Sequence, residues 1–173
     1  MRQFILFLVA FLFFVLDSIF AQLLAGAFFG REIILVPYFM IVFIFFLTIY
    51  GSRKYAMIYG AILGLFYDVV YTEVLGIYMF LIPFLAYLIA KCMKVLQNNW
   101  IIVIFLTLVF VAIAEVVLYE MNVIMSFAHL NFNEFVKMRL LPTVCLNFVY
   151  IVVFFYPFKR LILNFSEPNE VDL

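Results

Sequence analysis

The chain has 173 residues, of which 71% are hydrophobic and 12% charged, and its ten basic and ten acidic side chains cancel to a formal net charge of zero. A soluble protein needs more polar side chains to cover its surface, so this composition indicates an integral membrane protein. The zero net charge and the lack of a basic arm argue against a nucleic-acid partner. Six apolar stretches, each near the roughly 20 residues that cross a bilayer, leave no room for a soluble catalytic domain.

We therefore predict an all-α integral membrane protein with one six-helix transmembrane domain over residues 1–165 and a short acidic tail at 166–173. Pro37 falls in the first turn of the second helix, where a missing N–H costs little, and Pro83 predicts a kink in the fourth. After Pro157, apolar residues at helical spacing over 158–165 predict a short helix in the inner membrane interface. The expected helices span roughly 4–29, 33–50, 55–70, 78–90, 98–121 and 134–156.

Charged residues between these stretches alternate in kind. Lys and Arg gather before the first stretch and after the second, fourth and sixth, whereas the other gaps hold mainly acidic residues. Since short loops rich in Lys and Arg stay on the cytoplasmic side, both termini are predicted to be cytoplasmic. The basic residues that set this orientation are Arg2, Arg53, Lys54, Lys91, Lys94, Lys159 and Arg160.

The sequence holds little that could bind a metal or a cofactor. Cys92 and Cys145 both fall in or near predicted helices, so we expect free thiols. With one histidine and no pair of cysteines at ligand spacing, we expect no metal site and no cofactor.

Two aspartates fall inside predicted helices, where a charge is costly. Asp17 lies in the middle of the first helix. It is either a buried carboxylate that is hydrogen-bonded to a neighbouring helix or a group that recognises a partner or ligand. Asp68 lies near the outer end of the third helix, after Gly60 and Gly64, whose spacing lets two helices pack backbone to backbone. Asp68 either accepts backbone N–H groups at the turn into the fourth helix or makes a functional contact.

Glu115 and Arg139 lie at similar depths in the fifth and sixth helices, so we expect them to pair, with Glu120 and Lys137 as a shallower pair. Thr143 and Asn147, one turn apart, are expected to donate or accept hydrogen bonds between helices. The inner half of the spans has almost no ionisable residues except at its rim. The residues that fall in the outer half or the outer loops are Asp68, Glu73, Glu115, Glu120, Glu134, Lys137 and Arg139. This asymmetry predicts a polar pocket or a docking surface that opens outward.

The run Gly60-Ala-Ile-Leu-Gly64-Leu-Phe-Tyr-Asp68, followed by Leu75-Gly76 and the helix 78–90, resembles the rod shape-determining protein MreD family. The resemblance implies a non-enzymatic component of the bacterial cell-elongation machinery in the inner membrane. It implies MreC as main partner, and through it MreB and RodA with its class B transpeptidase. It also implies a fold similar to the S components of energy-coupling-factor transporters. The candidate interface and polar residues are Gly60, Gly64, Asp68, Glu73, Gly76, Asp17, Glu115 and Arg139.

A vitamin-binding S component of such a transporter is the alternative function, since Ala21 and Ala25 resemble the small-residue spacing used there for docking. An outward cavity of about 300 Å³ or more with convergent donors would favour the vitamin binder, and a filled bundle with an exposed groove of small residues would favour the scaffold. An intramembrane protease using Asp17 and Asp68 is disfavoured, because the two carboxyl groups would lie at different depths.

Overall fold

The computed structural model describes residues 2–27, 33–72, 74–96, 99–126 and 131–166, and these form helices and connecting segments without a strand. Six helical rods result, because α6, the π-helical turn η1 and α7 run on as one, as the sequence predicted. The helices are α1 (Arg2–Ala27), α2 (Phe39–Tyr50), α3 (Arg53–Tyr71), α4 (Ile77–Val95), α5 (Trp100–Ile124), α6 (Phe132–Phe135), η1 (Val136–Leu140) and α7 (Leu141–Phe165).

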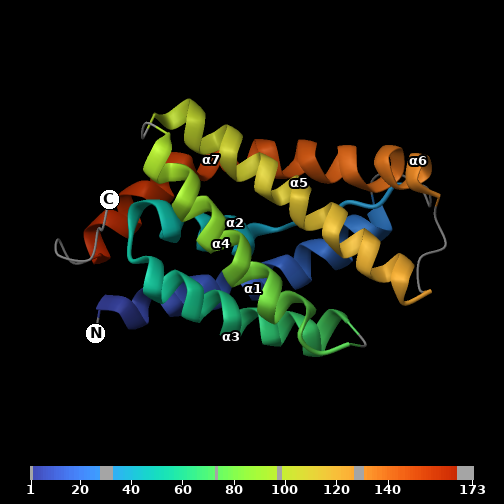
Figure 1. The fold of residues 1–173 in the computed structure, drawn as a ribbon, viewed down its shortest axis with the longest axis horizontal. Coiled ribbons are helices and arrows are strands. Elements are labelled where there is room, and N and C mark those ends of the chain that lie inside the picture. Colours follow the sequence, from blue (N-terminus) through green and yellow to red (C-terminus); the bar gives the residue numbers. More distant parts are fainter. Residues whose placement is uncertain (1, 28–32, 73, 97–98, 127–130, 167–173) are drawn as a thin grey trace.

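Helix α2 forms the centre of the bundle and contacts α1, α3, α4, α5 and α7. Its sequence is apolar on every side, and all of its residues except Ile49 are buried. A helix of this kind has no face for a polar surface and is suited to the middle of a bundle. The start of α1 and the end of α7 lie at the same end of the molecule, and α6 lies at the other (Figure 1).

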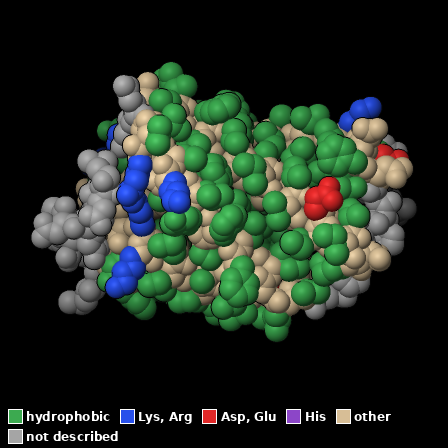
Figure 2. Space-filling model, viewed as in Figure 1, with side chains coloured by type: hydrophobic (Ala, Val, Ile, Leu, Met, Phe, Trp, Pro, Cys, Tyr) green, Lys and Arg blue, Asp and Glu red, His purple; other side chains and the backbone are tan. Residues whose placement is uncertain are grey.

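Four helical segments in the described part of the chain are long and apolar enough to cross a membrane: Gln3–Leu23, Ile77–Val95, Trp100–Ile124 and Phe132–Phe165. Figure 2 shows a broad hydrophobic surface between the two ends, with basic side chains at the end that holds the start of α1. That end also holds Arg53 at the start of α3 and Lys94 in the last turn of α4. The basic residues of the sequence pattern thus gather at one end of the bundle.

The second helix begins later than predicted. Residues 33–38 are not helical, and α2 starts at Phe39. Pro37 explains the difference, because a proline pushes the residue before it towards extended backbone and cannot donate a hydrogen bond. At 12 residues, α2 is about 18 Å long, short of a bilayer core of roughly 30 Å. The extended segment 33–38 runs from the α6 end to α2 and supplies the missing length (Figure 1).

The interfacial helix predicted after Pro157 is also wrong, because α7 continues through this proline to Phe165. The apolar stripe exists, but Phe158 and Ile162 are buried in the bundle. The Phe158 ring packs edge-on against Phe43 and Phe46 of α2. Membrane helices tolerate a proline where neighbouring groups compensate for the lost hydrogen bond. Packing on α2 therefore holds this segment against the protein.

Candidate functional site

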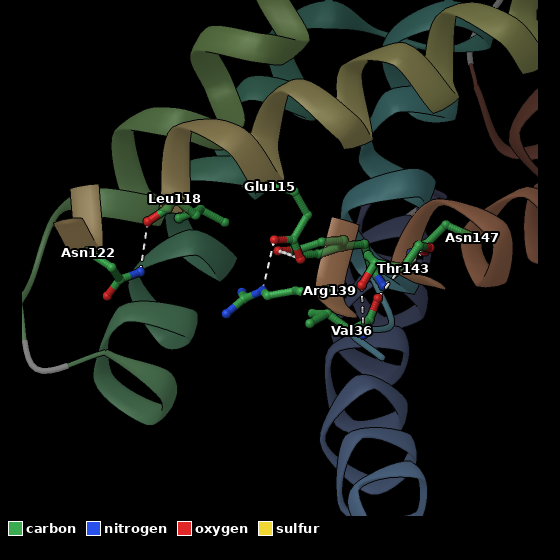
Figure 3. A network of polar contacts seen from close by, with 8 residues as sticks. Val36, Glu115, Leu118, Asn122, Arg139, Thr143 and Asn147 are labelled. Carbon is green, nitrogen blue, oxygen red and sulfur yellow. Dashed lines mark hydrogen bonds and ion pairs between the residues drawn. The ribbon is translucent and has the colours of Figure 1, made fainter. Parts of the chain in front are cut away.

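The extended segment 33–38 lies among helices, where a backbone group without a partner costs several kcal/mol. Side chains of α7 supply the partners. The Val36 N–H donates to Thr143 Oγ1 (3.2 Å), and the Tyr38 N–H donates to Asn147 Oδ1 (3.1 Å). Asn147 Nδ2 donates to the Val36 carbonyl (3.0 Å; Figure 3). Thr143 and Asn147 thus make long-range hydrogen bonds as predicted, but their partner is the backbone of the extended segment and not another helix.

A backbone carbonyl of η1 provides a further partner for this segment. The Ile34 N–H donates to the Met138 carbonyl (2.8 Å). In a regular helix that carbonyl would accept the N–H of the residue four positions later, but this residue is Pro142, which has none. The backbone also widens here, with the Leu141 N–H donating to the Val136 carbonyl five residues earlier. Pro142 therefore frees the carbonyl that Ile34 uses.

Asp17 of α1 caps the start of α2 from the side. Its carboxylate accepts the N–H groups of Phe39 (2.8 Å) and Met40 (3.1 Å) and the hydroxyl of Tyr67. These backbone groups have no partner within α2, and an anion at a helix N-terminus is favourable. The prediction of a buried carboxylate bonded to a neighbouring helix is confirmed, since Asp17 is 2% exposed.

Asp68 does for α4 what Asp17 does for α2. Its carboxylate accepts the N–H groups of Gly76 (2.9 Å), Tyr78 (2.8 Å) and Met79 (3.0 Å), and the residue is fully buried. Gly76 has a φ of +110°, a conformation that glycine adopts without strain, and it precedes α4. Of the two interpretations of Asp68, the structure shows the one in which it ties the turn between α3 and α4.

Gly60 and Gly64 face α4 of the same chain. A Cβ atom added to Gly64 would lie 2.6 Å from the Tyr78 carbonyl oxygen, and one added to Gly60 would lie 2.9 Å from Cγ2 of Ile82. The close approach predicted from the glycine spacing is present. Because both glycines are buried between α3 and α4, they position the Asp68 cap and are not on the surface. Glu73 lies outside the described residues.

The predicted ion pair between Glu115 of α5 and Arg139 of η1 is formed, with Arg139 Nε donating to Glu115 Oε2 at 3.0 Å (Figure 3). Glu115 is fully buried, and its other oxygen accepts the Tyr38 hydroxyl at 2.9 Å. The pair therefore also holds the residue that precedes α2. The predicted pair of Glu120 and Lys137 is not formed, although the structure describes both residues.

Two adjoining cavities open beside this network. One, of about 400 Å³, is lined by Asp17, Ala21, residues 33–37, Tyr67, Tyr71, Tyr78 and Arg139. The other, of about 360 Å³, is lined by Tyr71, Thr72, Val74, Ile77, Tyr78, Leu118, Asn122, Met125 and Arg139. Because they share Tyr71, Tyr78 and Arg139, we treat them as one feature, the polar cleft. It lies away from the basic end of the bundle, as the distribution of charges predicted.

The described residues give no support to an aspartic dyad, because Asp17 binds α2 while Asp68 binds α4, and no hydrogen bond joins the two. Sequence reasoning missed Tyr38 and Tyr67, the hydroxyl donors to Glu115 and Asp17. A tyrosine in an apolar run carries no signal of its partner. Pro37 was the available signal for the extended segment.

Sequence comparisons with known proteins cover nearly the full length of the chain. A family model described as rod shape-determining protein MreD matches residues 1–165. The chain belongs to the MreD family. It is 33% identical over 167 residues to the rod shape-determining protein MreD of Bacillus subtilis (strain 168), covering 96% of this chain and 97% of that protein. It is 31% identical over 152 residues to the cell shape-determining protein MreD of Streptococcus pneumoniae (strain ATCC BAA-255 / R6), covering 86% and 90%. No solved structure matched the chain.

Proposed function

We propose that this MreD-family protein is a non-enzymatic membrane scaffold of the bacterial cell-elongation machinery and that it binds MreC. The observation that carries the proposal is the family match over residues 1–165, together with relatives named as shape-determining proteins. It resides in the inner membrane as a multi-pass protein with both termini in the cytoplasm. Through MreC it joins MreB and RodA with its class B transpeptidase.

The polar network supports a scaffold rather than a catalyst. Asp17 and Asp68 accept backbone N–H groups of two helix starts. Glu115 accepts from a tyrosine and an arginine. Carboxylates used in this way fix the positions of helices and are poorly placed to exchange protons with a substrate. A rigid bundle with defined outer faces is what a docking partner requires.

MreC would meet the bundle on its exposed surface, since the glycines and Asp68 are buried inside it. A single membrane-spanning helix can pack along a lipid-facing helix, and an extracytoplasmic part can rest on the outer ends of α5 and α6. In this proposal, MreC binds through helix packing and through the outer loops.

Affinity purification from native membranes in mild detergent, followed by mass spectrometry, tests the proposal. A tagged wild-type chain should recover MreC and the elongation polymerase, whereas an unrelated six-helix membrane protein with the same tag should not. In a rod-shaped host that lacks its own MreD, the chain should restore cell width, measured by microscopy. Failure to recover MreC by purification and by cross-linking in intact cells would refute the proposal.

A vitamin-binding S component remains the second candidate, and the polar cleft is the observation in its favour. Each of its two cavities exceeds the roughly 300 Å³ expected of a ligand site. A fold similar to the S components would fit a bundle of six helices. The same purification separates the two functions, because a transporter would bring down a pair of soluble ATPases and a membrane coupling subunit.

A further inference from the structure

Arg139 differs from the other charged groups of the polar cleft in having donors to spare. The hydrogen bond of its side chain within the described residues runs from Nε to Glu115. The arginine lines both cavities, and its side chain is 27% exposed. Figure 3 shows the guanidinium group held beside Glu115, on the side of the network where Asn122 also lies. The outer edge of a permanently charged, planar fork is therefore open to the cleft.

The anionic groups around the cleft are already occupied. Asp17 accepts three hydrogen bonds, and both oxygens of Glu115 have donors. Other polar groups of the lining are also taken up within the protein: Tyr71 bonds to Ser18, and Asn122 Nδ2 donates to the Leu118 carbonyl. Arg139 therefore keeps N–H groups that can donate hydrogen bonds to a ligand in a fixed direction. An oxyanion with two acceptor oxygens, such as a phosphate, complements it.

An apolar groove between α4 and α5 continues from the cleft. This groove, of about 550 Å³, is lined by Leu75, Gly76, Ile77, Phe80, Leu81, Phe84, Val117 and Met121. Ile77 also lines the polar cleft, so the two join at the start of α4. Phe80 and Phe84 are 71% and 57% exposed. The groove therefore opens sideways towards the hydrocarbon of the bilayer.

We propose that the polar cleft and the groove together bind a membrane lipid that carries a phosphate group. The phosphate accepts hydrogen bonds from the free edge of Arg139, and the hydrocarbon chain lies along the groove between α4 and α5. Arg139 is seven residues after the start of α6 at Phe132, or about 10 Å along the helix, a depth that a lipid phosphate can reach. This inference is independent of the proposed scaffold function, since it concerns binding of lipid and not of MreC.

The test measures lipid binding to the purified full chain by native mass spectrometry. Three probes separate the parts of the ligand: dioleoyl phosphatidic acid, dioleoylglycerol with the same chains but no phosphate, and inorganic phosphate with no chain. We expect one site for phosphatidic acid, with dioleoylglycerol and inorganic phosphate each binding at least about tenfold more weakly. Equal binding of dioleoylglycerol would remove the role of the phosphate. Equal binding of inorganic phosphate would mean that the cleft takes a free anion and would refute a lipid ligand.

Two variants locate the site. Glu115→Gln combined with Arg139→Gln removes the charge without leaving a buried carboxylate alone, and should weaken phosphatidic acid binding at least about tenfold. Lys137→Gln is the matched control, because Lys137 is an exposed cation of the same helical turn that lines neither part of the cleft. The affinity of the Lys137→Gln variant for phosphatidic acid should stay within about twofold of wild type, since exposed charges contribute little.

Val117→Trp fills the groove without touching the ion pair, so it tests the proposal even if the double variant fails to fold. It should weaken phosphatidic acid binding, whereas Val153→Trp, at an exposed position of α7 outside the cleft and groove, should not. Unchanged lipid binding in folded variants at both sites would refute the proposal. If those variants keep the lipid but lose MreC in a purification, the cleft is a protein-docking surface and the lipid assignment is wrong.

Discussion

Replacing Asn147 with leucine should lower the free energy of unfolding by more than the loss of one hydrogen bond would. Asn147 satisfies both the N–H of Tyr38 and the carbonyl of Val36 in the extended segment. Leucine has a similar size but no polar atom, so both backbone groups would be left buried without these partners. The prediction isolates the role of the side chain as a substitute for helical hydrogen bonds.

The magnitude follows from the two orphaned groups. Each buried backbone group that loses its partner costs about 1–3 kcal/mol, which gives about 2–6 kcal/mol for Asn147→Leu. Thr143→Val removes only the acceptor of the Val36 N–H, so about half of that effect is expected. Asn122→Leu removes a bond to the Leu118 carbonyl of its own helix, and side-chain hydrogen bonds in membranes average only about 0.6 kcal/mol.

The assay is unfolding of the purified protein by SDS in mixed micelles, followed by far-ultraviolet circular dichroism. The free energies of unfolding should fall in the order Asn122→Leu, Thr143→Val and Asn147→Leu, with the last the least stable. Asn122→Leu is the matched control, because it makes the same chemical change in a partly buried asparagine whose hydrogen bond, among the described residues, lies within α5. If Asn147→Leu and Asn122→Leu differ by less than about 0.5 kcal/mol, the extended segment does not depend on Asn147.

Three further predictions use the same titration. Gly64→Ala should cost more than Gly60→Ala, because the added Cβ meets backbone at 2.6 Å instead of a side-chain methyl at 2.9 Å; equal costs would contradict the packing argument. Asp68→Asn should lower the free energy of unfolding by about 2–4 kcal/mol and speed hydrogen exchange at the start of α4, because three N–H groups lose their carboxylate acceptor. Unchanged exchange would argue against the cap. Arg139→Gln should lower the free energy of unfolding by about 2–4 kcal/mol, somewhat less than for a fully buried pair because the Arg139 side chain is 27% exposed. Adding Glu115→Gln should restore part of this stability. A double variant as unstable as the single one would contradict the pairing.

Several features of the fold followed from local sequence. Charge and hydropathy predicted six helical rods, and similar depth in two helices predicted the pair of Glu115 and Arg139. The glycine spacing predicted close packing of α3, and a cap on the turn after Asp68 was one of the two interpretations that the sequence left open. Each of these depends on residues that are near one another in the chain or at matching depths, so a one-dimensional pattern contains them.

Other features depended on groups far apart in the sequence. Backbone groups of the extended segment 33–38 find hydrogen-bond partners in Thr143 and Asn147, which lie 107 to 111 residues later in the chain. Asp17 could be recognised as buried, but its partners at the start of α2 and on α3 appear only in the folded bundle. Pro157 predicted the end of a helix, but α7 continues through it, and Phe158 packs on α2.

The sequence by itself therefore determined the class of the protein and the number of its helical rods, because a bilayer imposes the length and polarity of each span locally. The tertiary structure decided which groups hold the extended segment before α2 and where the polar cleft forms. In a medium without water, each exposed N–H and C=O needs a partner, and which distant side chain supplies that partner depends on how the helices pack.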